Sequence, residues 1–460
     1  MLRNLELPDG DAPVYQRLAD AIGERIASGE LTSGDRLPPH REIAKALGIN
    51  VTTVTRAFAA LQDRGLVEAR PGRGTLIAAA PAEQSFQSAP SDEDDLIDLS
   101  INRPPTLAYS EALTALLPRL SRDRRFAALQ DYHAPEGPAW ARKAVADWLG
   151  DVAGQRDPGR IVLTDGAQHG LACALRAVAQ RGDIILADSV TYQGINALCR
   201  SLGLDLRGLP MDRDGMRPDA FENACASLRP RAVFLIPSLH NPTTITLSEE
   251  RRRALAAVAR RHNVLIIEDD VYRPLLEQKL PSFAALEPEL TIYIGCLSKC
   301  VAPGLRYGFV VAPRALLGHV AAALRIDCWS ISPMTALVAT CLMEEGLLAS
   351  IIETQREELR LRQAILQEML GSSDVQTAPT CTHAWLHLPD PWRGAAFARM
   401  CRQRGIGVLP ADAFAIGRET LTHAVRINLG AAANSAVLRQ ALATIDDLLR
   451  SGDIQVAGAI

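Results

Sequence analysis

The chain has 460 residues, of which 48% are hydrophobic and 22% charged, with a formal net charge of −4 at pH 7. This length allows two or three domains with a large core, and the composition is typical of a globular soluble protein. No apolar run approaches the roughly 20 residues of a membrane-spanning helix and the N-terminus has no signal-peptide pattern, which argues against a membrane or secreted protein and predicts a cytoplasmic one.

Three helices are predicted near the N-terminus. Apolar residues at helical spacing indicate an amphipathic helix over residues 13–28. A second helix over residues 41–47 ends at Gly48, and Asn50 caps a third helix over residues 51–64. The buried face of the third helix is expected to consist of Val54, Phe58 and Leu61.

A hairpin is predicted next, with strands over residues 65–70 and 74–77. Its turn places Arg73 where it can enter a minor groove or contact phosphate. Residues 1–78 contain ten acidic and ten basic side chains, but seven of the basic ones and three of the acidic ones lie between Arg36 and Arg73. This distribution predicts a local basic face, although a three-helix unit can also be a protein-interaction module.

Residues 12–78 resemble the winged helix-turn-helix of the GntR regulators. The resemblance rests on Gly34-Asp-Arg-Leu-Pro38, Arg41-Glu42, Thr53-Val54 and Gly65-Leu-Val67, followed by the turn of the hairpin. The family commonly has arginine at the start of the recognition helix, where this chain has Val51, so a different operator is expected. The resemblance implies DNA contacts by Arg36, Arg41, Asn50, Thr52, Thr53, Arg56 and Arg73.

The region that follows is predicted to be a linker. Residues 79–95 are rich in alanine, proline, serine and glutamine, end in four acidic residues and contain few bulky apolar side chains. Such a composition favours a flexible segment over a packed element. We therefore expect a DNA-binding domain over residues 1–78, a linker over residues 79–95 and a second domain over residues 96–460.

The first candidate ligand-binding motif of the second domain is a strand, a turn and a helix. Residues 160–164 predict a strand, residues 165–168 a turn with one glycine, and residues 169–180 a helix with regularly spaced apolar residues. Backbone N–H groups and the helix dipole at such a helix start would hold a phosphate. One glycine in a strand-turn-helix is weak evidence by itself.

Two further strands end in polar residues. Residues 232–237 lead to Asn241-Pro242, which alone is only a turn signal, and residues 264–268 lead to Asp269 and Tyr272. A carboxylate can keep a pyridine nitrogen protonated, and a phenol or an amide can bond the ring oxygen beside it. Taken alone, the adjacent carboxylates of Asp269 and Asp270 at this strand end also fit a metal site or a helix cap.

The most informative residue is Lys299, which follows a predicted strand over residues 291–296. The chain has only four lysines among its 49 basic residues, so arginine is used where a plain positive charge suffices. Apolar surroundings would lower the pKa of Lys299, as an imine-forming amine requires. Ser298 beside it and Arg306 seven residues after it would donate hydrogen bonds to a phosphate. A Ser-Lys pair at a strand end is otherwise commonly solvated.

These motifs, in order, resemble the fold-type I aminotransferases of class I/II over about residues 96 to 450. After Asn241-Pro242 the chain has Thr243-Thr244 where the family has Thr-Gly, so this loop must turn without a glycine. The resemblance rests on Tyr132 with Gly137, Gly166-Ala167-Gln168, Tyr192, Asn241-Pro242, Asp269 with Tyr272, Ser298-Lys299, Arg306, and Arg426 in Val425-Arg-Ile-Asn-Leu-Gly430.

The resemblance implies pyridoxal 5'-phosphate as the cofactor, with Lys299 as the catalytic lysine that forms the imine. Asp269 would pair with the ring nitrogen, Asn241 and Tyr272 would hold the 3-oxygen, and Tyr192 would stack on the ring. Arg426 would clamp the carboxylate of a substrate or effector. The phosphate would be bound by Gly166, Ala167, Gln168, Ser298 and Arg306, and by Tyr132 of the neighbouring subunit.

Together the two halves resemble the MocR subfamily of GntR regulators. The implied fold is α/β: a winged helix-turn-helix, a large domain with a mostly parallel sheet, and a small C-terminal α+β lobe. The implied protein is a homodimer that binds a double-stranded DNA operator and senses an amine, an amino acid or pyridoxal phosphate through a Lys299 imine. An active aminotransferase with a DNA-binding head, or a C-terminal domain that only builds the dimer, remain alternatives. Nine cysteines without close metal spacing predict reduced thiols and no metal.

Overall fold

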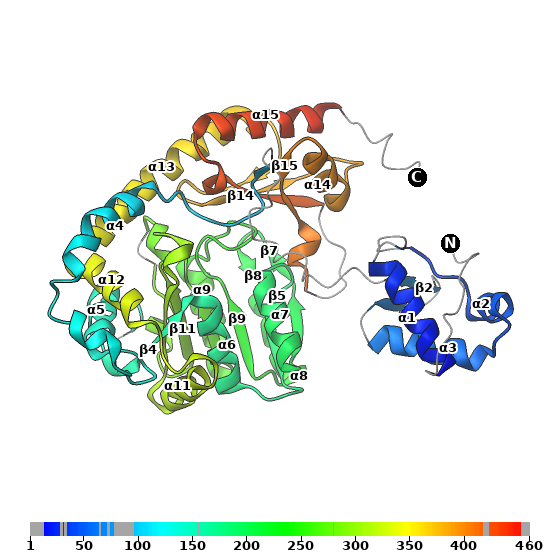
Figure 1. The fold of residues 1–460 in the computed structure, drawn as a ribbon, viewed down its shortest axis with the longest axis horizontal. Helices are drawn as coiled ribbons and strands as arrows, with labels where there is room; N and C mark the ends of the chain where they lie inside the picture. Colours follow the sequence, from blue (N-terminus) through cyan, green and yellow to red (C-terminus); the bar gives the residue numbers. More distant parts are fainter. Residues whose placement is uncertain are drawn as a thin grey trace. The chain divides into compact units, whose positions relative to one another are not determined.

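The computed structural model of the chain (Figure 1) describes residues 13–27, 31, 35–63, 66–70, 74–77, 96–154, 156–278, 280–416 and 423–451. The chain divides into two compact units, residues 1–89 and residues 90–460. The predicted linker over residues 79–95 lies outside the described residues, as does Arg73. The domain boundaries at these positions therefore stay predictions.

The N-terminal unit consists of three helices and a hairpin. Its elements are α1 (Val14–Ala27), α2 (His40–Leu47), α3 (Val51–Asp63), β1 (Val67–Arg70) and β2 (Gly74–Ile77). The two strands pair antiparallel, with Val67 opposite Ile77, and the Leu37 N–H donates to the Thr75 carbonyl at 2.9 Å beside them. This is the winged helix-turn-helix that the sequence predicts.

Local chemistry sets the helix boundaries of this unit. Gly48 ends α2 with a left-handed φ of 65°, a conformation that favours glycine. The Oδ1 of Asn50 accepts the backbone N–H of Thr52 at 3.1 Å and so caps α3, as expected. The burial of the predicted α3 face is confirmed, because Val54, Phe58 and Leu61 lie in a core with Leu18 and Ile22 of α1.

A seven-stranded sheet is the centre of the C-terminal unit, with the strand order β4-β12-β11-β10-β9-β5-β6. Only β12 runs antiparallel to its neighbours, which confirms the expected mostly parallel sheet. The strands are β4 (Ile161–Asp165), β5 (Ile184–Asp188), β6 (Asp205–Leu209), β9 (Ala232–Leu235), β10 (Leu265–Asp269), β11 (Thr291–Cys296) and β12 (Tyr307–Val311).

Helices cover both faces of this sheet. Along β5, Ile185 and Ala187 belong to a core with α6 (Gly166–Val178) and α7 (Gln193–Leu202), while Leu186 belongs to another core. This alternation follows from the two-residue period of a strand, and it explains why the parallel strands are continuous apolar runs. The other core contains side chains of α8 (Pro218–Leu228) and α9 (Glu249–His262).

The remaining elements of the large lobe pack around this sheet. They are α5 (Ala139–Leu149), the hairpin β7 (Met211–Asp212) and β8 (Gly215–Met216), α10 (Phe283–Leu286), α11 (Arg314–Cys328) and α12 (Pro333–Glu344). One boundary differs from expectation. The helix predicted from residue 169 begins at Gly166, because the positive φ of 75° at this glycine lets the chain turn directly from β4 into α6.

The small lobe contains a four-stranded sheet and a separate core. Its strands β13 (Val375–Gln376), β14 (His383–His387), β17 (Ala424–Asn428) and β16 (Leu409–Pro410) are neighbours in that order. β3 (Ile97–Asp98) pairs in parallel with β15 (Ile406–Gly407). The helices of this core are α14 (Gly394–Gln403), α15 (Ser435–Ser451) and the C-terminal part of α13 (Leu347–Leu370). The first part of α13 and the helix α4 (Leu107–Leu120) pack instead in the core of the large sheet.

Among the described helices, none is by itself long and apolar enough to cross a membrane. The pair α12 and α13, which meet at a bend of 80°, passes that test only jointly and by length and composition.

Candidate functional site

Six strands of the large sheet point the same way, and the predicted site residues lie at or beyond the carboxyl ends of five of them. These five are β4, β5, β9, β10 and β11. Ligands of open α/β sheets bind at this edge, where the strand order reverses. The residues at or just after these ends are Gly166, Tyr192, Asn241, Asp269 and Lys299.

Lys299 lies just beyond β11 and is partly buried. Its Nζ donates a hydrogen bond to the backbone carbonyl of Asn102 at 2.5 Å. Burial lowers the pKa of Lys299 to about 8, because the protein interior disfavours the charged ammonium. A useful fraction of this amine is therefore unprotonated near neutral pH, and that is the form that attacks an aldehyde.

Asp269 is the last residue of β10 and is buried. Burial raises the pKa of its carboxyl to about 7, although the nearby Lys299 favours the carboxylate. Its Oδ1 has no hydrogen-bond partner among the residues that the structure describes. An unpaired buried acceptor is unfavourable unless a ligand supplies a donor, and the N–H of a protonated pyridine ring is such a donor. Asp269 therefore fits the ring nitrogen of pyridoxal phosphate.

Tyr272 and Asn241 are both buried in the same site. The Oη of Tyr272 accepts a hydrogen bond from the Nδ2 of Asn102 at 2.7 Å, which leaves its own hydroxyl hydrogen available for a ligand. The Oδ1 of Asn241 accepts from the Nη1 of Arg426 at 2.8 Å. The loop after Asn241 turns without glycine, as expected, because Thr244 takes a left-handed φ of 64°.

Donors for an anion gather at the start of α6. A Cβ on Gly166 would lie 2.6 Å from the Nη2 of Arg306, so only glycine lets this guanidinium approach the helix. The same Nη2 donates to the Asp165 carbonyl at 2.8 Å. Within the described part of the chain, the buried Oγ of Ser298 has no hydrogen-bond partner. Helix N–H groups, a guanidinium and a hydroxyl are the donors that a phosphate requires.

Tyr192 directly precedes α7 and bonds the first turn of α6. Its Oη donates to the Oε1 of Gln168 at 3.0 Å, and Gln168 Nε2 donates to the Gly194 carbonyl at 3.5 Å. Burial raises the pKa of the Tyr192 phenol, and the negative charge of Asp269 adds to that rise. Ala167 is partly buried in the first turn of α6. The structure therefore brings these predicted residues to one site.

Arg426 of β17 is buried and enters the site from the small lobe. Besides Asn241, it donates to the backbone carbonyl of Ser100, and its guanidinium lies 4.9 Å from the centre of the Phe414 ring. Burial lowers the pKa of Arg426 to about 10. No described carboxylate lies within ion-pair distance of it. Its partners are all neutral, which leaves the guanidinium suited to a ligand carboxylate.

Three residues that the sequence did not single out as site residues belong to this network. The Oδ1 of Asn102 accepts from the Oγ1 of Thr382 and from the Nδ2 of Asn428, each at 3.0 Å. Side chains alternate between the two faces of a strand, so Asn428 lies on the same face of β17 as Arg426, and this spacing could have indicated Asn428 as a site residue. Asn102 lies in an irregular segment without periodicity, and its partners are distant in sequence.

Tyr132 is not part of this network within one chain. It is 88% exposed, and its ring lies 5.5 Å from that of Trp329. Ile326, Trp329 and Met334 are also large exposed apolar side chains on neighbouring elements. Large exposed apolar side chains of this kind are typical of an interface.

The N-terminal unit exposes polar residues along α3. Thr52 and Arg56 are four residues apart and share a face of this helix, while Val51 at its start is 40% exposed. Arg36, Arg41, Asn50, Thr52 and Arg56 are exposed and Thr53 is partly buried, whereas Arg73 lies outside the described residues.

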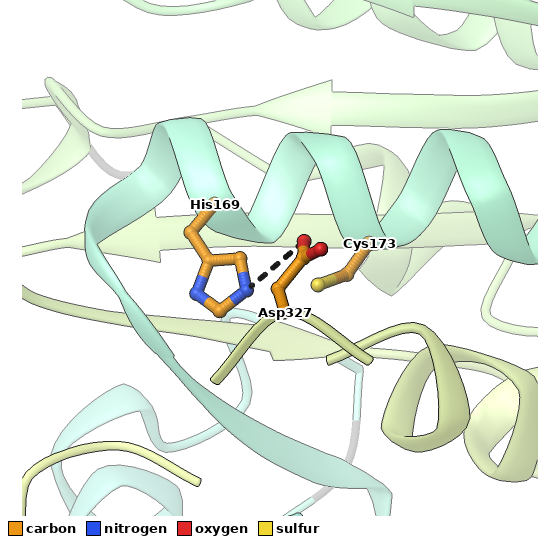
Figure 2. Close-up of side chains that lie close together, drawn as sticks. All are labelled: His169, Cys173 and Asp327. Atoms are coloured by element: carbon orange, nitrogen blue, oxygen red, sulfur yellow. Dashed lines mark ion pairs between the residues drawn. The ribbon is translucent and has the colours of Figure 1, made fainter. Parts of the chain in front are cut away.

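A second cluster of polar side chains lies between α6 and the end of α11. Figure 2 shows His169, Cys173 and Asp327, whose potential ligand atoms lie within 4.8 Å of one another. The Nδ1 of His169 accepts the Asp165 N–H at 3.2 Å, so the neutral ring carries its proton on the Nε2 that faces Asp327. Asp327 is also paired with Arg176. We interpret this cluster as an ionic link between the two helices, since both features oppose a bound cation.

Comparison with known proteins covers both units. Residues 94–445 match the family model described as aminotransferase class I and II, and residues 14–77 match that of the bacterial regulatory proteins of the gntR family. Both resemblances predicted from the sequence are confirmed.

Relatives named as transcriptional regulators match two thirds or more of the chain. The uncharacterized HTH-type transcriptional regulator YdeF of Bacillus subtilis (strain 168) is 28% identical over 95% of each chain. The probable rhizopine catabolism regulatory protein MocR of Rhizobium meliloti is 28% identical over 67% of each chain. The solved structure of kynurenine aminotransferase from Pyrococcus horikoshii aligns with a TM-score of 0.72 and 21% identity, over 80% of this chain and 96% of its own, and shows the shared fold.

Proposed function

The chain belongs to the aminotransferase class I and II family and carries a GntR-family segment, and from this we propose a pyridoxal-phosphate-dependent transcriptional regulator of the MocR subfamily. One observation carries the proposal. A single chain combines an exposed helix-turn-helix surface with a site in which the amine of Lys299 lies beside the unpaired carboxylate oxygen of Asp269. The regulator would sense an amine, an amino acid or the cofactor itself at Lys299.

Five residues would hold the ring end of the cofactor. Pyridoxal phosphate supplies an aldehyde and an electron-withdrawing ring when bound. Lys299 would present its unprotonated amine to that aldehyde, and Asp269 would keep a proton on the ring nitrogen. Tyr272 and Asn241 would donate hydrogen bonds to the 3-oxygen, while Tyr192 would lie against the ring face.

The phosphate end would be held mainly by the start of α6. Gly166, Ala167 and Gln168 form its first turn, where backbone N–H groups lack partners within the helix. The hydroxyl of Ser298 and the guanidinium of Arg306 would complete this set of donors. Because Gly166 and Arg306 touch, the position of the guanidinium depends on that glycine.

The protein would act as a homodimer in the cytoplasm. Tyr132 is exposed beside the ring of Trp329, and Ile326 is also exposed. A second copy covering these apolar side chains would bring Tyr132 of the partner subunit to the phosphate. Two copies also suit an operator, since paired half-sites match a two-fold symmetric protein.

The N-terminal unit would bind double-stranded DNA through α3 and its surroundings. Thr52, Thr53 and Arg56 would face the major groove, and Asn50, which caps the helix, would also reach the DNA backbone. The remaining contacts would come from Arg36, Arg41 and Arg73.

The rival function is transamination. Lys299 and Asp269 are placed as an active enzyme needs them, and Arg426 is free to bind a substrate carboxylate. A regulator differs in holding its ligand instead of turning it over, and in changing its DNA affinity when the ligand binds.

One experiment separates the two functions. Purified protein loaded with pyridoxal phosphate is screened with amines and amino acids, while the visible spectrum, keto-acid formation and affinity for its own promoter DNA are recorded. The regulator requires a ligand that shifts both the spectrum and the DNA affinity with slow turnover. Fast multiple turnover with DNA affinity unchanged by every ligand would establish an aminotransferase. Lys299→Ala is the control that should lose the cofactor band, and Lys143→Ala, at an exposed lysine, should keep it.

A further inference from the structure

The segment from Ile97 to Pro105 directly follows Leu96, the first described residue after residue 77, and it runs through the cofactor site. It begins as β3, which lies beside β15 of the small lobe. The N–H of Asn428 donates to the Leu99 carbonyl at 2.8 Å, so the segment is also tied to β17. It then passes Lys299 and leads into α4, which begins at Leu107.

Asn102 is the residue of this segment that meets the catalytic lysine. Its backbone carbonyl accepts the Lys299 Nζ at 2.5 Å, and its Nδ2 donates to the Tyr272 Oη at 2.7 Å. Its Oδ1 accepts from Thr382 and Asn428, each at 3.0 Å. The backbone carbonyl of Asn102 thus holds the lysine, while its side-chain amide joins the phenol of the large lobe to two side chains of the small lobe.

The direction of these bonds matters for the site. Because Tyr272 accepts from Asn102, its own hydrogen is left to donate to the ring oxygen of the cofactor. Two residues earlier, the Ser100 carbonyl accepts from Arg426. The same short segment therefore contacts Lys299, Tyr272 and Arg426. These residues would bind the cofactor aldehyde, the ring 3-oxygen and a ligand carboxylate, respectively.

Resting on the proposed regulatory function, we propose that Asn102 is a positioning residue that couples the bonding state of Lys299 to residues 97–105, and through them to the DNA-binding unit. A Lys299 nitrogen bound to the cofactor aldehyde cannot donate to Asn102 as the free amine does. When a ligand amine takes the aldehyde, the C=N bond passes to the ligand nitrogen and Lys299 leaves as a free amine that can bond Asn102 again. The two states differ at this segment, which is the condition for a ligand to shift an equilibrium.

Hydroxylamine provides a minimal probe for this coupling. It takes the aldehyde from Lys299 as an oxime and has no carboxylate, so it frees the lysine without engaging Arg426. DNA affinity of the full-length protein is measured with the cofactor bound to Lys299 and again after hydroxylamine. We expect the two dissociation constants to differ severalfold in the wild type and to become equal in Asn102→Ala. This variant keeps the backbone carbonyl that meets Lys299 but loses the side-chain bonds to Tyr272, Thr382 and Asn428 that tie this carbonyl to both lobes. The absorbance band of the cofactor should still form in the variant and still be lost to hydroxylamine.

A control variant and a second readout make the test decisive. Asn223→Ala, at an exposed asparagine of α8, should retain the wild-type difference. Asn102→Ala that keeps the full difference would overturn the proposal. Should this variant fold poorly, amide hydrogen exchange of the wild type decides, because exchange of residues 97–105 must change when hydroxylamine frees Lys299. Unchanged exchange there would overturn the coupling even if amino acids alter DNA binding. Changed exchange with DNA affinity insensitive to every ligand would instead refute the regulatory function.

Discussion

The lowered pKa of Lys299 makes the rate of cofactor attachment depend on pH in a defined way. Burial lowers this pKa from 10.5 to about 8. At pH 7 about one amine in ten is then unprotonated, roughly 300-fold more than at the ordinary pKa, since each pH unit changes the ratio tenfold. Only the unprotonated amine attacks the aldehyde, so the rate should rise about tenfold from pH 6 to pH 7 and level off above about pH 8.

Stopped-flow absorbance measures this rate after the protein without cofactor is mixed with excess pyridoxal phosphate. A small-molecule primary amine, measured in parallel, corrects for the ionisations of the cofactor itself. Lys143→Ala should reproduce the wild-type profile. Asp269→Asn should move the midpoint below that of the wild type, because the negative charge of Asp269 favours the ammonium form of Lys299.

The reasoning fails if the rate climbs without levelling up to pH 10, because Lys299 would then titrate like a solvated amine. It also fails if Asp269→Asn raises the midpoint, since the carboxylate would not be acting on Lys299 through its charge. A profile that is flat from pH 6 to pH 9 would mean that a step other than attack by the amine limits attachment.

Three further predictions concern the phosphate, the DNA and the ligand carboxylate. Gly166→Ala should weaken cofactor binding at least tenfold in an absorbance titration, because the added Cβ would displace Arg306. Gly182 also has a positive φ, but a Cβ added there would have no neighbour within 4 Å, so Gly182→Ala should lower the melting temperature and leave cofactor affinity unchanged. Arg41→Ala should weaken DNA binding and reduce the slope of log affinity against log salt by about one, as measured by fluorescence anisotropy, whereas Arg399→Ala of α14 should change neither. Arg426→Ala should leave the cofactor band intact and remove the response of DNA affinity to carboxylate-bearing amines while keeping the response to hydroxylamine; loss of the band would show that Arg426 serves the cofactor instead.

The strands of the site were predictable because each is a continuous apolar run that ends in a polar residue. This pattern predicted a strand that leads to Asp269, which is the last residue of β10, and a strand before Lys299, which is β11. Strands covered on both faces need apolar side chains throughout. Asn50 was predictable as the α3 cap because its side chain acts within two residues.

Contacts that join distant parts of the chain were not predictable in this way. Asn102 bonds Tyr272 and Thr382 although 170 and 280 residues separate them in the sequence, and neither helix nor strand periodicity constrains that segment. The start of α6 was placed too late because a glycine before a helix signals a turn, while here its positive φ begins the helix. The proposed role of Tyr132 requires a second chain, so it came from the family resemblance and not from a pattern within one chain.

The state of Arg426 indicates where the energy for a ligand response would come from. A buried guanidinium held only by neutral groups is less stable than one paired with a carboxylate, and burial accordingly lowers the pKa of Arg426 to about 10. A ligand carboxylate that pairs with it would gain about 1.5 to 3 kcal/mol per hydrogen bond to the charged group. That range is the size of a typical coupling free energy between two sites. Because Arg426 bonds the Ser100 carbonyl, two residues before Asn102, the pairing would act on the same segment that meets Lys299. An amino acid would thus act on that segment at two points, whereas an amine without a carboxylate acts at one, so a larger DNA response to amino acids than to simple amines is expected.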